Sequence, residues 1–210
     1  MSVGGSMRIV SSEVPLYDKF EKKMVPAVLL EDIEQERIEE TGLVWKHRRQ
    51  QLGQWSDIEH KHWDWGWKAN AARNYPGFQT FAIEHHGQMQ GLMLVYTKPY
   101  ATKLFPDKGK PILYVSYLES APDNVYGQHL KHVGVELYRT AIQYSINTGN
   151  EGRVGLHSLP QAEGFYENAC DMVHLGKDYS EEGWGLVYFE STRILSREFL
   201  KRKNKGDDYV

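Results

Sequence analysis

Cysteine, long apolar runs and excess charge are all scarce in this chain of 210 residues. Cys170 is the only cysteine, which excludes an intrachain disulfide and a metal cluster built from cysteines. No apolar stretch approaches the roughly 20 residues that a membrane-spanning helix needs, and residues 1–6 lack the layout of a secretory signal. We therefore expect a cytoplasmic protein with a free thiol and no membrane partner.

The charge balance is nearly even. A formal net charge of -3 provides no broad basic surface, so we expect no nucleic-acid partner. Hydrophobic residues make up 40% of the chain and charged residues 25%, which is ordinary for a packed domain and argues against general disorder. Because there is no internal repeat, low-complexity block or linker, residues 1–210 are expected to form a single domain.

The N-terminal third mixes charged residues with aromatic and aliphatic ones. From Leu16 to about Trp67 this mixture predicts two or three amphipathic helices rather than strands, so residues 1–76 are expected to be a helical elaboration. Phe78 to His85 and Met89 to Tyr96 then predict two strands, with a tight turn at His86-Gly87 between them.

The middle of the chain contains its clearest patterns. Ile112 to Ser120, rich in aliphatic and aromatic residues, predicts a strand. A polar connection follows from Asp123 to about Lys131, and Val133, Leu137, Ala141 and Tyr144 then recur at helical spacing up to Gly149.

The C-terminal third predicts shorter elements. Arg153 to His157 is expected to be a strand, and Ser158 with Gln161 has the form of a capping box that would open a helix to about Ala169. The remaining elements that we expect are a closing pair of strands at Met172 to Gly176 and Trp184 to Phe189, and a surface helix from Thr192 to Lys205 with a frayed end.

The start of the helix at Val133 suits an anion. A polar loop that leads into a helix offers unpaired N–H groups and the positive end of the helix dipole, which fits a pyrophosphate. Gly134 would let a phosphate approach the backbone, and His129, Lys131 and His132 would add donors or charge. Taken alone, these features fit an ordinary surface loop and helix equally well.

The stretch from Tyr117 to Asn168 resembles the donor-binding core of GNAT acetyltransferases. The resemblance is carried by Tyr-Leu-Glu-Ser-Ala-Pro, by Gly-Val-Glu-Leu-Tyr-Arg-Thr-Ala-Ile and by Gly-Leu-His-Ser-Leu-Pro-Gln-Ala-Glu-Gly-Phe-Tyr-Glu-Asn. In that family an Arg/Gln-x-x-Gly-x-Gly/Ala pattern wraps the CoA pyrophosphate. The corresponding positions here are His129, His132 and Gly134, so only the last glycine of the pattern is kept.

The resemblance implies an α/β fold of GNAT type. The family's sheet is mixed and mostly antiparallel, with about six or seven strands flanked by helices and a V-shaped split between its fourth and fifth strands. It also implies acetyl-CoA as co-substrate and no metal. Residues 77–190 would then form the sheet core and the CoA-binding region, residues 191–210 the C-terminal helix and tail, and residues 1–76 the acceptor side.

The resemblance further implies transfer of an acetyl group to a primary amine by direct attack in a ternary complex. Glu119 would be the base, because an alkylammonium with a pKa of about 10.4 has no lone pair near neutral pH. Tyr166 would protonate the leaving thiolate, and the main chain from Leu118 to Ser120, where the family's strand bulges, would polarise the thioester. Alternation places Glu119 on one face of the strand with Val115 and Tyr117.

Several of these positions have alternative explanations. Glu119 could be a solvated carboxylate at a strand end, and Tyr166 a packing residue. His157, at the end of its strand, would be an alternative base or a substrate contact, although a lone histidine there is more often structural. The diphosphate would be held by the loop from Tyr126 through Gly134, with the residues His129, Lys131, His132, Val133, Gly134 and Val135 in contact with the donor.

Three tryptophans form the other unusual group. Trp63, Trp65 and Trp67, with Asp64 or Glu59 nearby, would provide aromatic walls and negative charge for a cationic amine, although such a group is more often core packing. Glu59, His60 and His62 lack the HExxH spacing, so no zinc site is expected.

The sequence leaves the acceptor open between a small-molecule amine and a protein or peptide amine. Because the phosphate-loop pattern is altered, a catalytically silent module of the same fold that binds CoA or another protein is the main alternative. The acyl chain length and the oligomeric state, including a homodimer, are also open.

Overall fold

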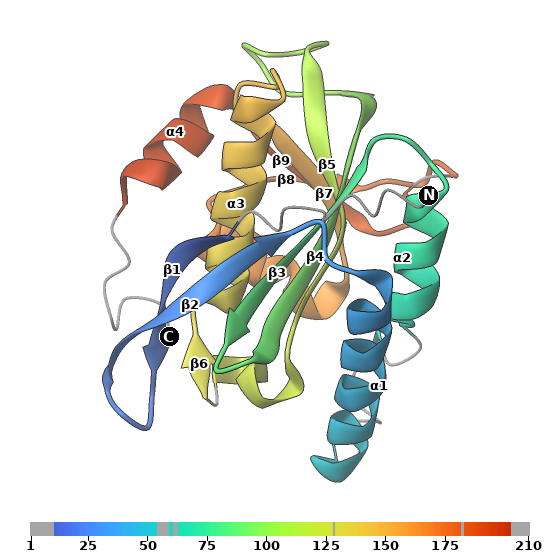
Figure 1. Ribbon diagram of the computed structural model, residues 1–210. Coiled ribbons are helices and arrows are strands. Elements are labelled where there is room, and N and C mark those ends of the chain that lie inside the picture. Colours follow the sequence, from blue (N-terminus) through green and yellow to red (C-terminus); the bar gives the residue numbers. More distant parts are fainter. Residues whose placement is uncertain (1–10, 54–58, 61–62, 128, 182, 203–210) are drawn as a thin grey trace, which may run out of the picture.

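The computed structural model describes residues 11–53, 59–60, 63–127, 129–181 and 183–202. Its strands form one nine-stranded sheet in the order β6-β1-β2-β3-β4-β5-β7-β9-β8 (Figure 1). Neighbouring strands are antiparallel except β5 and β7, which are parallel. The mixed, mostly antiparallel sheet is therefore confirmed, and it has more strands than the six or seven expected.

The strands are β1 (Ser11–Asp18), β2 (Lys23–Glu31), β3 (Phe78–His85), β4 (Gln88–Ala101), β5 (Pro111–Ser120), β6 (Leu130–Lys131), β7 (Val154–Ser158), β8 (Val173–Lys177) and β9 (Val187–Ser191). The α-helices are α1 (Gln35–Gln51), α2 (Trp65–Arg73), α3 (Val133–Asn147) and α4 (Arg193–Lys201). Shorter helical turns are η1 (Pro122–Gly127), η2 (Pro160–Ala162) and η3 (Phe165–Ala169). Within the part of the chain that is described, no helix is both long and apolar enough to cross a membrane.

The described part of the chain starts with the hairpin of β1 and β2, so the prediction of helices from Leu16 onward was wrong for these two strands. Inward-facing residues of β2 do alternate, as in any strand, with Val25, Ala27 and Leu29 buried. Met24 and Val28, on the outward face, are apolar as well and exposed. Because both faces carry apolar side chains, the period of two is hidden in the sequence. Helices α1 and α2 follow as expected.

A second correction concerns the segment after β7. Ser158 does not cap a helix: its hydroxyl donates to the carbonyl oxygen of Leu159 at 2.9 Å. The predicted helix to Ala169 is instead the 3₁₀ turn η2 followed by the π-helical turn η3. The other predicted elements from Phe78 onward, β3, β4, β5, α3, β7, β8, β9 and α4, are confirmed within a few residues at their ends, and the connection before α3 also contains η1 and the short β6.

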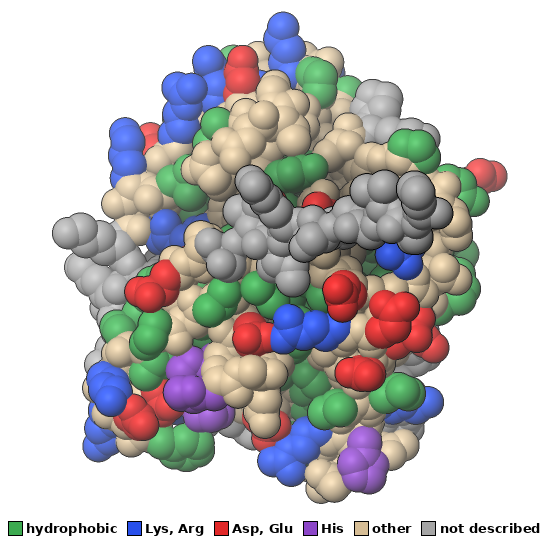
Figure 2. Space-filling model, viewed as in Figure 1, with side chains coloured by type: hydrophobic (Ala, Val, Ile, Leu, Met, Phe, Trp, Pro, Cys, Tyr) green, Lys and Arg blue, Asp and Glu red, His purple; other side chains and the backbone are tan. Residues whose placement is uncertain are grey.

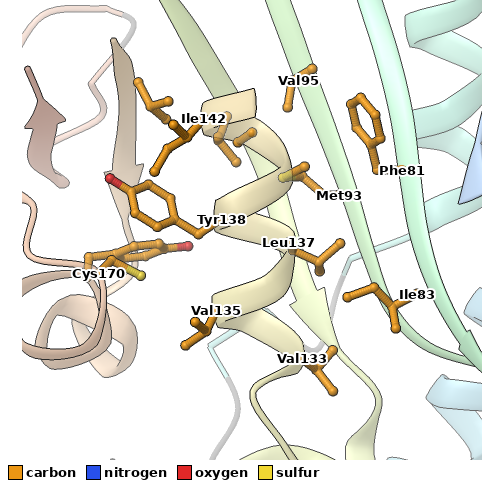
Figure 3. Packing of buried hydrophobic residues seen from close by; sticks show 14 of the residues in the cluster. Phe81, Ile83, Met93, Val95, Val133, Val135, Leu137, Tyr138, Ile142 and Cys170 are labelled. Atoms are coloured by element: carbon orange, nitrogen blue, oxygen red, sulfur yellow. The ribbon is translucent and has the colours of Figure 1, made fainter. Parts of the chain in front are cut away.

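Helices cover both faces of the sheet (Figure 1). On one face, α3 packs Val133 and Leu137 toward Ile83 and Met93 of β3 and β4, as Figure 3 shows. On the other face, α1 and α2 pack a second cluster that contains Trp45. Strand β5 lies between the two clusters and contributes side chains to both.

A β-bulge in β5 decides which of its side chains face which layer. Val115 pairs with Val95, but the next pair along β4 is Leu94 with Tyr117, so Ser116 is the extra residue. Val115 consequently packs in the α3 cluster, whereas Tyr117 packs against the α1 and α2 cluster. The prediction that Val115 shares a face with Tyr117 and Glu119 was therefore wrong, because a bulge resets the alternation.

The pairing between β5 and β7 is short. It consists of Leu113 with Val154 and Tyr114 with Gly155, although β5 continues to Ser120. Among the described residues, β5 has no further pair with β7 beyond Tyr114. The V-shaped split between these two strands remains a prediction, and the short pairing is the feature that favours it.

Candidate functional site

Glu119 lies in a buried network rather than in solvent. Its residue is 4% exposed, and its carboxylate accepts hydrogen bonds from the buried guanidinium of Arg49 and from Nε1 of Trp65 at 2.6 Å. The Nε2 atom of His60 lies 3.1 Å from the same oxygen that Arg49 contacts. The interpretation of Glu119 as a solvated carboxylate is therefore wrong. Three partners share its lone pairs, which leaves little room for a further hydrogen bond.

The three tryptophans do not form one wall. Trp65 is buried and donates to Glu119, Trp63 is half-buried, and Trp67 is 67% exposed. Asp64 is the N-cap of α2, where it accepts from the N–H of Trp67 at 2.8 Å. Trp63 and Trp65 both lie against the ring of Tyr117, whereas Trp67 lies at the surface, and their role in binding an acceptor remains a prediction.

Lys68 occupies the aromatic cage. Its ammonium nitrogen lies 3.0 Å from the ring centroid of Tyr117 and 4.0 Å from that of Trp63. Trp63, one of the three rings that were expected to bind a cationic amine, therefore already contacts a lysine of the chain itself. Burial lowers the pKa of Lys68 to about 7, while Glu119 and Asp64 oppose that change. Its place in the buried stripe of α2, with Ala69 and Ala72, was the signal that could have identified it.

His157 lies in a chain of polar contacts. Its Nδ1 is 2.7 Å from the hydroxyl of Tyr114, and its Nε2 is 3.3 Å from a carboxylate oxygen of Asp178. Hydrogen bonds from Ser180, together with Lys103, hold the pKa of Asp178 far below its usual range. Sequence analysis identified His157 but missed Tyr114 and Asp178, which belong to other strands and loops.

Tyr166 lies in η3, buried against Phe165 and Phe189 with ring centroids 5.1 Å and 6.0 Å away. Desolvation raises the pKa of its phenol well above the usual value, and Cys170 and Tyr114 add to that rise. The phenol therefore keeps its proton at neutral pH, which is what a general acid requires.

The connection before α3 is tied to the N-terminal hairpin. Strand β6 pairs with β1, so that Lys131 lies opposite Tyr17. His129 lies 3.5 Å from the carboxylate of Asp18, and its ring packs on Phe20. Gln128, within the loop that was expected to hold a diphosphate, lies outside the described residues. His129 and Lys131 are thus positioned by β1 as well as by the loop.

At the start of α3, His132 adopts a left-handed conformation with φ 78°. It is buried, and desolvation lowers its pKa. A Cβ added to Gly134 would lie 2.8 Å from Cζ of Phe165, so this glycine makes room for an aromatic ring. Gly134 is still partly exposed, whereas the side chains of Val133 and Val135 are buried. The three amides of this first turn are the groups that suit a diphosphate.

Leu118 and Ser120 lie in β5 after the bulge. Leu118 packs against the α3 cluster and pairs with Met93, and Ser120 pairs with Gly91. Both are only partly buried. For the described part of the chain, no group of three or more His, Cys, Asp or Glu side chains is arranged to hold a metal ion. His62 lies outside that part.

A separate groove of about 1050 Å³ runs along α1. Arg37, Val44 and Arg48 of α1 form one side, and the turn between β3 and β4 forms the other, near Asp123. Glu119, His157 and Tyr166 do not line it. On the face shown in Figure 2, acidic and basic side chains are interspersed rather than gathered by sign.

Comparison with known proteins finds structures that share the fold of this chain. No protein-family model and no curated protein matches the sequence. An uncharacterised protein from Bacillus halodurans superposes with a TM-score of 0.57 at 9% identity, over 92% of this chain and 95% of its own. A bacterial toxin superposes with a TM-score of 0.51 at 12% identity, over 94% of this chain and 99% of its own.

A predicted acetyltransferase with acetyl-CoA from Clostridium acetobutylicum superposes with a TM-score of 0.47 at 10% identity, over 74% of this chain and 92% of its own. The first two likenesses extend over nearly the whole chain and show a shared fold. In the described residues the sheet is mixed and mostly antiparallel, with β5 and β7 as its parallel pair and α3 between them in the chain, which agrees with the GNAT-type fold that the sequence predicts.

Proposed function

We propose that this protein transfers an acetyl group from acetyl-CoA to a primary amine by direct attack in a ternary complex. The observation that carries the proposal is the end of the β5–β7 pairing at Tyr114, two residues before the bulge at Ser116. Along β5 the N–H groups alternate in direction, so those after the bulge that point away from β4 face the side of β7. In the proposed complex, an N–H near Leu118 would polarise the thioester carbonyl.

The donor would be held at the start of α3. The amides of Val133, Gly134 and Val135, together with the positive end of a 15-residue helix, suit the diphosphate. Lys131 and His129 would add charge or donors at its edge. When bound, acetyl-CoA would supply the activated acyl group, and its pantetheine arm would pass between β5 and β7 beyond Tyr114, the last residue of β5 that pairs with β7 among the described residues.

The protein's own side chains supply the proton transfers. Tyr166, buried and protonated, would give its proton to the departing thiolate. The amine nitrogen must lose a proton to a base, and the two candidates are Glu119 and His157. Glu119 is already engaged by Arg49, Trp65 and His60, whereas a carboxylate orients His157. This difference favours His157 as the base and gives Glu119 the role of anchoring the acceptor side.

A second candidate function is a silent module that binds CoA or a partner without catalysis. Two contacts favour it: the three donors on Glu119 and the ring of Phe165 over Gly134. The acceptor distinguishes the two candidates, because only an enzyme releases thiol in proportion to an added amine.

Donor binding is tested first by thermal unfolding with acetyl-CoA. At a ligand concentration of about 100 Kd, binding to the folded state stabilises it by roughly 2.7 kcal/mol. We expect Lys131→Glu to weaken this stabilisation more than Lys131→Gln does, since it places a like charge beside the diphosphate. An unchanged melting temperature at millimolar acetyl-CoA would contradict the proposal.

Catalysis is tested by thiol release with a panel of amines and short peptides. Tyr166→Phe should lower turnover by about 10²–10⁴-fold without changing the stabilisation by acetyl-CoA. Tyr138→Phe is the matched control, because it removes another buried phenol, one that packs on Phe199. Stabilisation by acetyl-CoA with no release for any acceptor would favour the silent module instead.

A further inference from the structure

We propose that Lys68 is a self-acetylation site, whose side-chain amine accepts an acetyl group from acetyl-CoA bound to the same chain. This inference rests on the proposed function, because it uses the same donor. It goes beyond that function by naming an acceptor within the protein itself. The class of reaction is transfer of an acyl group from a thioester to a lysine amine, and the product is an amide on the side chain.

The amine of Lys68 is buried without a hydrogen-bond partner. The residue is 5% exposed, and its nitrogen contacts the rings of Tyr117 and Trp63. Among the described residues, no hydrogen bond or ion pair reaches this nitrogen. A buried cation held by ring faces alone is costly, because the rings replace only part of the hydration that it loses. The arrangement therefore favours the neutral amine, which is the nucleophilic form of a lysine.

The contact with Tyr117 brings Lys68 next to the part of β5 that the proposed function uses. Tyr117 directly precedes Leu118, whose main chain would polarise the thioester. Helix α2, which carries Lys68, lies on the face of the sheet opposite α3 (Figure 1), whereas Tyr166 packs in the α3 cluster. The attacking nitrogen and the proposed acid would therefore approach the thioester from opposite layers of the fold.

The surroundings of Lys68 lower its affinity for a proton. Desolvation lowers the pKa of Lys68 to about 7, and the nearby carboxylates oppose that change. At neutral pH about half of the chains then carry a neutral amine, whereas an ordinary lysine is neutral in fewer than about one chain in a thousand. Charged and titratable groups reach Lys68 directly or through one neighbour from each element that packs around it: Glu119 and Tyr117 of β5, Asp64 at the N-cap of α2, Arg49 of α1, and His60 between α1 and α2.

The aromatic contacts hold the unreactive form and release the reactive one. Attraction between an ammonium and the face of a ring requires the positive charge. When Lys68 loses its proton, the contacts with Tyr117 and Trp63 weaken, and no hydrogen bond restrains the nitrogen. The flexible stem of the lysine can then turn the neutral amine toward the bound donor.

The reaction balances without a further reagent. The neutral nitrogen of Lys68 forms a C–N bond with the thioester carbon, and the C–S bond breaks. The nitrogen loses one proton to water, and the departing thiolate gains one, so that the products are an acetylated lysine and CoA with a free thiol. An uncharged amide then replaces the ammonium at the acceptor side of the fold.

The experiment incubates the full chain with acetyl-CoA at about pH 8, where most of Lys68 is neutral, and locates acetyl groups by intact mass and peptide mapping. We expect one acetyl group per chain, on Lys68, and none in Lys68→Arg, which keeps a cation but not a nucleophile. Lys46→Arg is the matched control, because Lys46 is an exposed lysine of α1, and it should be acetylated as the unchanged chain is. Acetyl groups spread over exposed lysines, with Lys68 unmodified, overturn the proposal. The map of the unchanged chain decides this even if Lys68→Arg does not fold.

The pH dependence of the initial rate is the second readout. The rate at Lys68 should rise about tenfold per pH unit below about pH 7 and level off above it, because its pKa is about 7. Acetylation of an exposed lysine should keep rising toward about pH 10. A rate at Lys68 that still rises tenfold between about pH 8 and about pH 9 would overturn its assignment as the reactive amine.

The outcomes separate this proposal from the proposed function. If acetyl-CoA stabilises the folded state and Lys68 stays unmodified, self-acetylation is overturned while the proposed function stands. Acetylated Lys68 with no thiol release for any added amine supports self-acetylation and contradicts transfer to an external acceptor. Neither thermal stabilisation nor modification would overturn both.

Discussion

The two faces of β5 carry different kinds of side chains. Toward α3 the strand presents Leu113, Val115 and Leu118, all within or against a single apolar cluster. Toward α1 and α2 it presents Tyr117 and Glu119, which contact cations and hydrogen-bond donors. The bulge at Ser116 shifts the alternation by one residue, so that Val115 and Leu118 face α3 while Tyr117 and Glu119 face the other layer. The strand thus packs apolar side chains on one face and presents polar and charged contacts on the other.

The comparison shows how differently burial acts on the two faces. Apolar burial stabilises by about 25 cal/mol per Å² removed from water. Burial of Arg49, Lys68 and Glu119 costs desolvation energy that their mutual attraction only partly offsets. A fold that keeps three charged side chains under its α1 and α2 layer therefore gains little stability from them, which is consistent with a functional reason for their presence.

Removing one partner of the buried ion pair should give the largest effect. Arg49→Met leaves the carboxylate of Glu119 buried without its main counter-charge, and we expect a loss of about 3–5 kcal/mol in the free energy of unfolding. The measurement is urea unfolding. Arg48→Met is the matched control, because its partner Asp123 is partly exposed, and it should cost at most about 1 kcal/mol. Equal losses in the two variants would remove the distinction between the pairs.

The apolar face is tested by Leu137→Ala on α3. Leu137 is fully buried against β3 and β4, so the cavity should cost about 2–4 kcal/mol. The folded state should be destabilised, while acetyl-CoA should still stabilise the folded variant as it does the unchanged protein. A loss below about 1 kcal/mol would mean that this face is less tightly packed than its burial indicates.

Lys68→Met should stabilise the protein, by about 1–3 kcal/mol near neutral pH. The pKa of Lys68 is lowered from 10.5 to about 7 in the folded state, so folding disfavours its charged form. The penalty is complete below about pH 7 and fades as pH rises toward about 10.5, where the unfolded chain also loses the proton. Urea unfolding at about pH 6.5 and about pH 9.5 should show the larger gain at the lower pH. A gain independent of pH would contradict this explanation.

The smallest effect is expected at the cap of α2. Asp64→Ala removes the acceptor for the N–H of Trp67 and should cost about 1 kcal/mol. Asp64→Asn keeps an acceptor at the same place and should restore most of that loss. Thermal unfolding of the two variants side by side measures the difference, and equal melting temperatures would show that the cap contributes nothing.

Much of the fold could be predicted because its signals are local. The helix at Val133 has an apolar stripe of helical period, and β5 is a run of aliphatic and aromatic residues ended by Pro122. The hairpin of β1 and β2 could not be predicted, because its exposed face is apolar. The turns η2 and η3 were predicted as one helix, because Ser158 and Gln161 have the spacing of a capping box. In the structure, the hydroxyl of Ser158 donates to the carbonyl oxygen of Leu159 and does not cap a helix.

The candidate site divides in the same way. The sequence by itself determined which residues to single out: Glu119 and His157 stand at the ends of predicted strands, and Tyr166 matches a motif of the family that the sequence resembles. Their partners come from distant segments: Arg49 lies 70 residues before Glu119, and Tyr114 lies 43 residues before His157. Only the tertiary structure decided those pairings, because a bulge, a short parallel pairing and the packing of α1 and α2 set which side chains meet, and none of these leaves a local pattern.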